Sequence, residues 1–493
     1  MTDNRSDGPS EFSDGFSELA EATITEVPGT DDLVAPSTSP AGGISYVDAD
    51  EEDGNYVDPE LKRGRNLAVA ALGASQAIDN SEGGVVNTVF PLLIEAFGID
   101  RGALGIISSI SKFARGILGP TWAMLADRFG KKRVLFIVTG VWGLWTVATG
   151  FAPDYTWFLI LYSIAVCGTV ASEPILNGLM GDLFGRNERG RAFGLVRGIG
   201  TGVGMILTPA IALFGSEAFR NTETGVHDGW RYAMWTMGAL SLLSGLLILL
   251  WVKEPARSGK KVADDPDSGV FKLSDGFKLF KIPTVVLIAI MLPLVTSMVL
   301  FAFMQTYWVQ INGFTVPEAG FLYVAFSGGS VIGSILGGLT ADVMVRRFGH
   351  KGRIAMMQLY LISFAAITFV TFYFTNWGTS LIYWVLVFLT GLIFPIGFSA
   401  CVLPMVSTVV PTQLNATGFA MLFSLVQGLI TAVMTIAVGF ISETDLGFAN
   451  TIAIFVSGAY AVNAVYWFVF YKVYPKDVAR QKERTAQVAA GTF

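Results

Sequence analysis

The sequence has little charge and few of the residues with which soluble enzymes do chemistry. Only 15% of its 493 residues are charged, whereas an ordinary soluble domain carries about 25%. The two cysteines, Cys167 and Cys401, lie in apolar stretches, which excludes a disulfide framework and a cysteine-based metal site. The two histidines, His227 and His350, lie in polar joints without a nucleophile–base pair or a phosphate-binding loop. We therefore expect no enzyme activity, no cofactor, no metal ion and no nucleic-acid partner.

Apolar residues, in contrast, make up 52% of the chain, and the mean hydropathy is +0.55. They gather in twelve blocks separated by polar joints, at 66–97, 103–126, 134–151, 157–181, 191–214, 230–252, 284–310, 316–341, 354–375, 380–404, 413–440 and 449–474. A helix needs about 20 apolar residues to cross the hydrocarbon core of a bilayer. The sequence thus predicts an all-α membrane protein with twelve transmembrane helices, monomeric and surrounded by membrane lipids.

Charge divides the chain into tails, bundles and a linker. Residues 1–65 form an acidic tail whose composition predicts disorder. Two six-helix bundles follow at 66–252 and 284–474, with a linker at 253–283 and a second tail at 475–493. With both termini in the cytoplasm and Arg5 set aside, the inner joints hold 26 Lys and Arg residues and the outer joints hold three. The positive-inside rule therefore predicts that both tails lie on the cytoplasmic side of the cell membrane.

The linker ends in an amphipathic pattern. From Phe271 to Ile282, the residues Phe, Leu and Ile alternate with Lys at roughly helical spacing. This spacing favours a short helix on the anionic inner leaflet, and a plain solvated linker is the alternative.

Two joints carry similar motifs, one after the second predicted helix and one after the eighth. Their members are Asp127, Arg128, Gly130, Lys131 and Lys132 in the first joint and Asp342 and Gly349 in the second. The aspartates lie 215 residues apart, and each precedes Phe-Gly and a basic cluster. This recurrence predicts an internal repeat of a six-helix unit. A short turn between helices needs side-chain caps for its backbone and a glycine for the reversal, which the aspartate and Gly130 can supply.

The predicted helices, their six-plus-six repeat and the Asp-Arg-x-Gly-basic-basic motif resemble the major facilitator superfamily from residue 66 to 474. The resemblance implies secondary transport by alternating access. It also implies that Asp127 faces the start of the eleventh helix, at Thr412–Gln413, and helps to close the inner side of the outward-open state. Ala123 stands where the family motif usually has glycine, and the second copy has a two-residue insertion. A pure topology signal is the alternative role for this cluster.

The charges inside the predicted helices lie in the amino half. They are Asp79 and Glu82 in the first helix, Lys112 and Arg115 in the second, Glu173 in the fourth and Arg197 near the inner end of the fifth. The carboxy half offers amide, hydroxyl and aromatic groups, among which Gln305 and Tyr307 of the seventh helix are candidates for the cavity. A charge at the bilayer centre costs at least ~2.5–3.5 kcal/mol and is functional by default. We therefore assign these eight residues to proton coupling and the substrate cavity.

Helix geometry suggests partners for four of the charges. At 1.5 Å per residue, Asp79 and Arg115 lie about 21 and 18 Å from the inner surface, and Glu82 and Lys112 about 25 and 22 Å. The i,i+3 spacing places the two charges of each helix on one face. We predict the ion pairs Asp79–Arg115 and Glu82–Lys112, with Asp79 as a proton acceptor. A static cluster that only fixes packing is the alternative.

Two narrower resemblances exist within the superfamily. Asp79 in the first helix is similar to a membrane-embedded aspartate of spinster-like transporters, although Asn80 stands where that group has arginine. The run GIGTGVG followed by Pro209 resembles the glycine–proline motif of drug–proton antiporters. Close helix packing is the other explanation for these glycines.

Three functions fit this pattern. A cavity with one charged wall and one apolar, aromatic wall favours a proton-coupled exporter (an antiporter) of an amphipathic or lipid-like compound. Alternatively, Lys112 and Arg115 clamp a carboxylate in a proton symporter that imports a small organic anion. A membrane sensor without transport is the third possibility.

Overall fold

The computed structural model describes residues 64–184, 186–254, 279–410 and 420–489. The acidic tail up to residue 63, the larger part of the linker and the predicted start of the eleventh helix at Thr412–Gln413 lie outside these ranges. Of the amphipathic pattern that ends the linker, only the last four residues are described, and Leu279–Lys281 forms a single 3-10 turn. The described residues are almost entirely helical.

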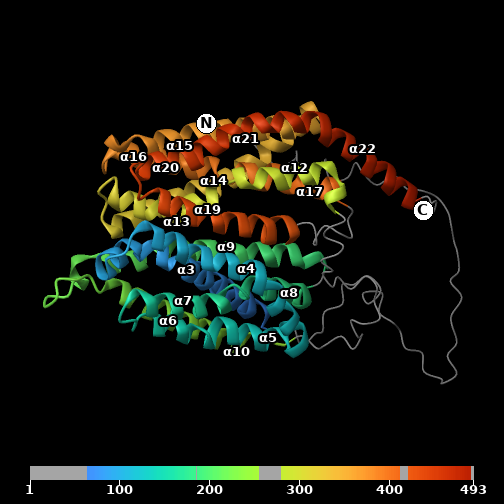
Figure 1. Cartoon of the computed structure of the whole chain (residues 1–493). Helices are drawn as coiled ribbons and strands as arrows, with labels where there is room; N and C mark the ends of the chain where they lie inside the picture. The colour runs from blue at the N-terminus through green and yellow to red at the C-terminus, as the bar shows by residue number, and fades with distance from the viewer. Residues whose placement is uncertain (1–63, 185, 255–278, 411–419, 490–493) are drawn as a thin grey trace, which may run out of the picture. The chain divides into compact units, whose positions relative to one another are not determined.

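The helices of the amino half gather on one side in Figure 1, and those of the carboxy half gather on the other. The first group comprises α3 (Arg65–Phe97), α4 (Arg101–Phe129), α5 (Lys131–Leu135), α6 (Gly143–Thr149), α7 (Tyr155–Thr169), α8 (Ser172–Leu183), α9 (Arg186–Ala212) and α10 (Gly229–Trp251). The second comprises α12 (Pro283–Met291), α13 (Ser297–Gln310), α14 (Val316–Phe348), α15 (His350–Tyr373), α16 (Leu381–Ile393), α17 (Leu403–Val409), α19 (Gln427–Ile441), α20 (Phe448–Ile452), α21 (Ala459–Tyr466) and α22 (Phe470–Ala489).

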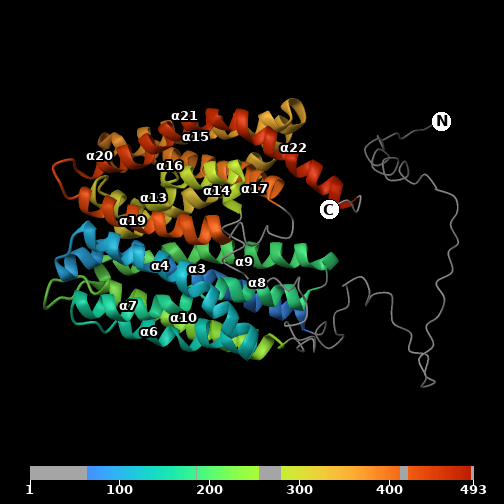
Figure 2. The same ribbon diagram turned by 45° about the vertical axis from the view of Figure 1, so that its right-hand side comes forward.

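Π-helical and 3-10 turns join several of these helices into longer rods. The π-helical turns are η1 (Phe136–Val141), η7 (Ile396–Val402), η9 (Ala420–Val426) and η10 (Ala453–Gly458). The 3-10 turn η5 (Leu292–Leu294), which contains Pro293, follows α12. Figure 2 shows α4 of the amino half beside α19 of the carboxy half. Contacts between α4 and α19 and between α9 and α14 are extensive.

Eight helical segments in the described part of the chain are long and apolar enough to cross a membrane. They are Tyr155–Met180, Ala192–Gly215, Gly229–Trp251, Pro283–Gln310, Val316–Phe348, His350–Tyr373, Leu381–Val409 and Phe448–Glu483. The blocks predicted at 66–97 and 103–126 form the continuous helices α3 and α4, and both contain several charged residues. The total of twelve and the six-plus-six repeat therefore stay predictions.

Local sequence signals explain where the main helices begin and end. The Asp100 carboxylate accepts a hydrogen bond from the Ala103 amide and caps α4, and Thr315 with Glu318 forms a capping box on α14. Gly130 (φ 105°) ends α4 and Gly349 (φ 59°) ends α14. Both values lie in the region that favours glycine. The chain reverses at Gly130, where the sequence predicts a tight turn, and Gly349 ends α14 with the same sign of φ.

Small residues let helices approach closely where the two halves meet. A Cβ atom on Gly105 of α4 would lie 2.8 Å from the carbonyl oxygen of Thr435 in α19. A Cβ atom on Gly439 of α19 would lie 2.8 Å from the carbonyl oxygen of Arg101. The Ser109 hydroxyl also donates to the Ala432 carbonyl at 2.7 Å. The contact depends on glycine, as interfaces inside membranes commonly do.

Candidate functional site

A cavity of about 390 Å³ lies between helices of the amino half and helices of the carboxy half. Its amino-half wall comprises Gly83, Asn87, Ser108, Ser111, Lys112, Arg115 and Tyr162. Its carboxy-half wall comprises Met298, Phe301, Ala302, Phe423, Gln427, Gly428 and Thr431. Both cations are on the first wall, and the second wall is apolar apart from Gln427 and Thr431. The two walls therefore differ in chemistry as the sequence predicts.

Lys112 contributes a cation to the amino-half wall without a facing carboxylate. Its Nζ atom donates to the carbonyl oxygen of Ser108, one turn earlier in α4, at 3.3 Å. Within the described ranges, no carboxylate oxygen lies within 4.0 Å of this ammonium group, and the charge that acts on it is that of Arg115. A polar lining of Asn87, Ser108 and Ser111 surrounds it. Among the described residues, the positive charge of Lys112 therefore has no compensating carboxylate.

Arg115 is held by a carboxylate from another helix. Its guanidinium donates to Oε2 of Glu173 in α8 at 2.9 Å, while Arg197 of α9 lies 3.7 Å from Oε1 of the same carboxylate. These three side chains are 57%, 44% and 58% exposed, respectively. One carboxylate thus lies between two arginines, and with Lys112 this part of the molecule carries an excess of positive charge.

Asp79 and Glu82 lie behind this wall, inside the amino-half bundle. Asp79 is 9% exposed and its Oδ2 accepts a hydrogen bond from Ser75 at 3.4 Å. Glu82 is 5% exposed. Its Oε1 accepts from Thr146 of α6, and its Oε2 accepts from Ser241 of α10 at 3.3 Å. Both carboxylates are therefore surrounded by hydroxyl groups rather than by a cation in the described part of the molecule.

The predicted ion pairs Asp79–Arg115 and Glu82–Lys112 are wrong. Arg115 pairs with Glu173, and Glu82 faces α6 and α10 instead of α4. Equal depth in the membrane is necessary for an ion pair between two helices, but it is not sufficient. The rotation of each helix about its own axis also decides which side chains meet. In the structure, the face of α3 that carries Asp79 and Glu82 points toward the other helices of the amino-half bundle. Glu173, which has no base on its own helix, finds two on neighbouring helices.

Gln305 and Tyr307 do not line the cavity. Both lie on α13 and are buried, and the Tyr307 hydroxyl donates to the Phe372 carbonyl of α15. The residues of α13 that reach the cavity are Met298, Phe301 and Ala302. Gln305 lies on the same face of α13 but one turn further along, beyond the cavity, and Tyr307 lies on the opposite face. The sequence reasoning missed Asn87, Ser108, Tyr162 and Gln427. Their polarity within apolar blocks was visible, but only the fold shows that they meet.

The motif predicted to form a gate is only partly described. Nothing is described of the Asp127 side chain, and Thr412–Gln413, its predicted partner, lies outside the described residues. Arg128 lies over the Phe129 ring at 5.5 Å. The Lys132 amide, at the start of α5, donates to Oε1 of Glu254 at 3.3 Å. Asp342 lies exposed on α14. The role of this motif as a gate stays a prediction.

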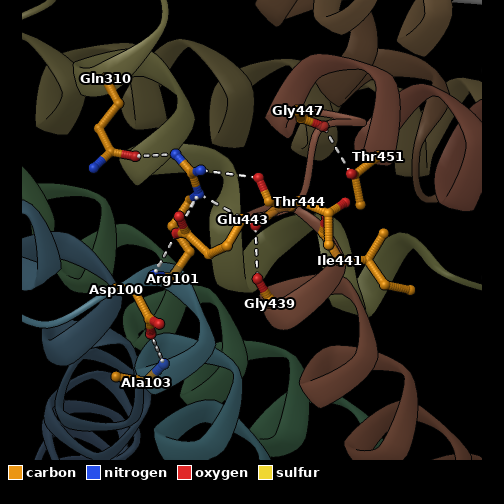
Figure 3. A network of polar contacts seen from close by, with 11 residues as sticks. Asp100, Arg101, Ala103, Gln310, Gly439, Ile441, Glu443, Thr444, Gly447 and Thr451 are labelled. Atoms are coloured by element: carbon orange, nitrogen blue, oxygen red, sulfur yellow. Dashed lines mark hydrogen bonds and ion pairs between the residues drawn. The ribbon is translucent and has the colours of Figure 1, made fainter.

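The Arg101 end of α4 is tied to the carboxy half by a polar network (Figure 3). The Arg101 Nε atom lies 2.9 Å from Oε1 of Glu443, its backbone amide donates to the same oxygen, and other guanidinium nitrogens donate to Gln310 and to the Ser442 carbonyl. The Arg101 guanidinium also lies over the Phe448 ring at 4.8 Å. Together with the glycine contacts of α4 and α19, this network, which we call the Arg101 seal, closes that end of the interface.

The sequence profile of the Major Facilitator Superfamily matches residues 72–435. The match begins within α3 and ends within α19, and it includes every residue of the cavity walls. The chain belongs to this superfamily. Membership of this superfamily and the long apolar helices indicate a multi-pass membrane protein, and membership indicates a transporter rather than an enzyme.

Individual relatives refine the comparison. The chain is 24% identical over 276 residues to a probable sulfoacetate transporter of Cupriavidus necator, which covers 54% of this chain and 62% of the relative. It is 27% identical over 205 residues to protein spinster homolog 1 of Xenopus laevis, covering 40% of this chain and 37% of that one. Each match therefore spans less than two thirds of the relative's own length. The spinster-like resemblance predicted from the sequence is confirmed.

A solved structure shows the same fold. A bacterial homologue of the human lysosomal transporter Spinster, in an inward-facing and occupied conformation, superposes with a TM-score of 0.68 at 17% identity. The superposition covers 84% of this chain and 98% of that one. At this identity the likeness concerns the arrangement of helices.

Proposed function

We propose that the protein is a proton-coupled secondary transporter that carries a small organic anion through the cavity by alternating access. The observation that carries this proposal is Lys112, a cation on the cavity wall without a carboxylate within 4.0 Å in the described ranges. An uncompensated charge inside a membrane costs at least ~2.5–3.5 kcal/mol. A carboxylate or sulfonate of the substrate would supply the missing negative charge. The resemblance to a probable sulfoacetate transporter supports the same class of substrate.

Arg115 completes the proposed anion site. Its guanidinium can form two parallel hydrogen bonds with a carboxylate or sulfonate, which gives it geometric specificity that an ammonium lacks. The Glu173 carboxylate forms an ion pair with Arg115 at the cavity wall. The same carboxylate also forms a longer ion pair with Arg197, at 3.7 Å. An arriving anion therefore competes with Glu173 for a guanidinium that is already oriented. Asn87 lines the same wall, and its amide nitrogen can donate to the anion. The Ser108 hydroxyl donates to Asn87 Oδ1 at 3.0 Å and so fixes the orientation of that amide.

We assign proton coupling to the buried carboxylates. An ionised carboxylate is costly to bury unless a cation or a proton compensates it, and Asp79 and Glu82 have hydroxyl partners instead of cations. Glu82 precedes Gly83, which lines the cavity. Negative charge in the cavity favours a proton on a nearby carboxylate. Anion and proton would therefore bind together, which is symport.

Orientation and location complete the proposal. The excess of Lys and Arg in the joints favours both termini in the cytoplasm and a place in the cell membrane. The Arg101 seal would then lie on the outer side, and the half-exposed cluster of Arg115, Glu173 and Arg197 would be reached from the cytoplasm. This arrangement corresponds to an inward-facing state of a monomer.

Export of an amphipathic or lipid-like compound, with antiport of protons, is the second candidate. The apolar wall of Met298, Phe301 and Phe423 favours it. Symport of a small anion accounts better for the uncompensated cation, because a lipid-like body does not require one.

The test is uptake of radiolabelled sulfoacetate into proteoliposomes that contain the purified protein. An imposed proton gradient should drive accumulation, and a pH-sensitive dye should report protons that move in the same direction. Sulfoacetate flux in the opposite direction to protons would favour antiport. Protein that moves neither sulfoacetate nor other short carboxylates and sulfonates under any gradient would contradict the proposal.

A further inference from the structure

A small apolar chamber of about 60 Å³ adjoins the anion cavity in the carboxy half. Three side chains, Met298, Phe423 and Gln427, line both spaces and form the boundary between them. Beyond this boundary the chamber is lined almost entirely by apolar and aromatic side chains, including Met357, Leu361, Phe394 and Phe398. The chamber therefore extends the cavity, but its lining is apolar, whereas the amino-half wall of the cavity is polar and positively charged.

Lys112 lies close to this boundary. Its backbone carbonyl oxygen is 3.7 Å from the position of a Cβ atom on Gly428, the neighbour of Gln427 in the chain. The cationic site on α4 and the entrance of the chamber on α19 therefore lie on facing helices at the same level. One compact molecule can reach both.

Two unusual turns build the chamber wall. Phe398 belongs to the π-helical turn η7, Phe423 belongs to the π-helical turn η9, and their rings meet edge to face at 4.9 Å between centroids. Π-helical turns are rare and occur frequently at functional sites. Here the two turns place the rings of Phe398 and Phe423 in the wall of the same chamber. Phe394, which also lines the chamber, packs edge to face against Phe301 of the cavity wall at 4.6 Å.

We propose that the chamber is a specificity subsite that receives a compact apolar substituent of the transported anion. The inference rests on the proposed function and extends it from organic anions in general to anions with a short alkyl or aryl group. The charged end binds at Lys112 and Arg115, and the apolar end passes Phe423 into the chamber. The chamber holds on the order of four water-sized volumes, so it accepts a few carbon atoms and excludes a full lipid chain.

A series of linear alkanesulfonates from methanesulfonate to octanesulfonate tests the subsite. The protein is placed in lipid nanodiscs, and competition of each sulfonate against radiolabelled sulfoacetate gives its affinity. Each methylene that enters the chamber should raise affinity about fourfold. The gain should then stop within the series, once the chamber is full.

Variants separate the subsite from the anion site. Val402→Phe and, as a milder change, Val402→Leu should shorten the sulfonate at which the gain stops, because Val402 lines the chamber but not the anion cavity. Methanesulfonate should bind to both variants as it does to the wild type. Phe369→Trp is the matched control, because Phe369 is 40% exposed and lies outside both spaces. It should leave the whole series unchanged.

The possible failures are distinguishable. Methanesulfonate binding that requires Lys112, combined with an affinity that does not change with chain length, would overturn the subsite and leave the proposed function intact. Affinity that rises without limit up to octanesulfonate would also overturn the subsite, since that is partition into a larger apolar space. Loss of Lys112 dependence for every sulfonate would contradict the proposed function itself.

Discussion

The cation-bearing wall of the cavity and the carboxylates behind it show how one bundle can keep opposite charges apart. Lys112 and Arg115 on α4 lie on the cavity surface, while Asp79 and Glu82 on α3 lie inside the bundle among hydroxyl groups. If these charges had paired, both sites would be neutral, and neither would need a ligand. Under the proposed function, this separation leaves the first site to bind an anion and the second to bind a proton. This separation is what coupled transport needs.

The largest effect should come from removing the uncompensated cation. We expect Lys112→Met to lower sulfoacetate transport about 100-fold, since losing one partner of a desolvated charge pair costs ~2–5 kcal/mol. Folding should not suffer, because the variant removes an unpaired charge. Lys476→Met on the exposed face of α22 is the control and should transport normally. Proteoliposome uptake measures both, and normal uptake by Lys112→Met would remove the basis of the anion site.

Neutralising Glu82, which lies behind the cation-bearing wall, should reduce proton coupling more than it reduces the movement of substrate across the membrane. We expect Glu82→Gln to reduce accumulation driven by a proton gradient at least tenfold, because the amide cannot exchange a proton. Exchange of labelled for unlabelled sulfoacetate should continue, since it requires alternating access but no proton release. The comparison of gradient-driven uptake with exchange checks this. If both fall together, Glu82 supports the fold rather than the coupling.

A moderate effect should follow from releasing Arg115. We expect Glu173→Gln to tighten sulfoacetate binding by about threefold to tenfold, because the anion no longer competes with a carboxylate for the guanidinium. The half-exposed position of all three side chains keeps the effect small. Equilibrium binding in nanodiscs measures the change. Weaker binding would mean that Glu173 orients Arg115 more than it competes with the substrate.

The smallest effect should come from the Arg101 seal, far from both charge sites. We expect Glu443→Gln to shift the balance between outer-closed and outer-open states a few-fold, since a partly exposed ion pair is worth about 0.2–1 kcal/mol. A larger shift is expected for Gly105→Val, since a Cβ atom at Gly105 already meets the backbone of α19. Labelling of a cysteine introduced near Gln310 reports the change. Unchanged labelling in both variants would place the outer closure elsewhere.

Composition, hydropathy and motifs were enough to predict the helical membrane fold and the superfamily. The motif also predicted the tight reversal at Gly130, because positive φ is a local property of one residue. The charged wall was correctly assigned to the amino half, since the carboxy-half helices have almost no ionisable residues to contribute. These predictions depend on the sequence near each residue or on its average composition.

The partners of the charges could not be predicted in the same way. Glu173 meets Arg115 from α8 and Arg197 from α9, so the cluster depends on how three helices are rotated and placed. The same holds for Glu82, whose partners Thr146 and Ser241 come from α6 and α10. A helical repeat fixes which residues share a face, but only tertiary packing decides where that face points.

The separation of the two charge sites can be tested directly by ligand-induced stabilisation. Thermal unfolding in nanodiscs is followed with and without sulfoacetate for the wild type, Lys112→Met and Glu82→Gln. A ligand at 100 times its dissociation constant stabilises the folded state by about 2.7 kcal/mol. The account predicts this stabilisation in the wild type and in Glu82→Gln, and its loss in Lys112→Met. Equal stabilisation of all three proteins, or its loss in both variants, would contradict the account.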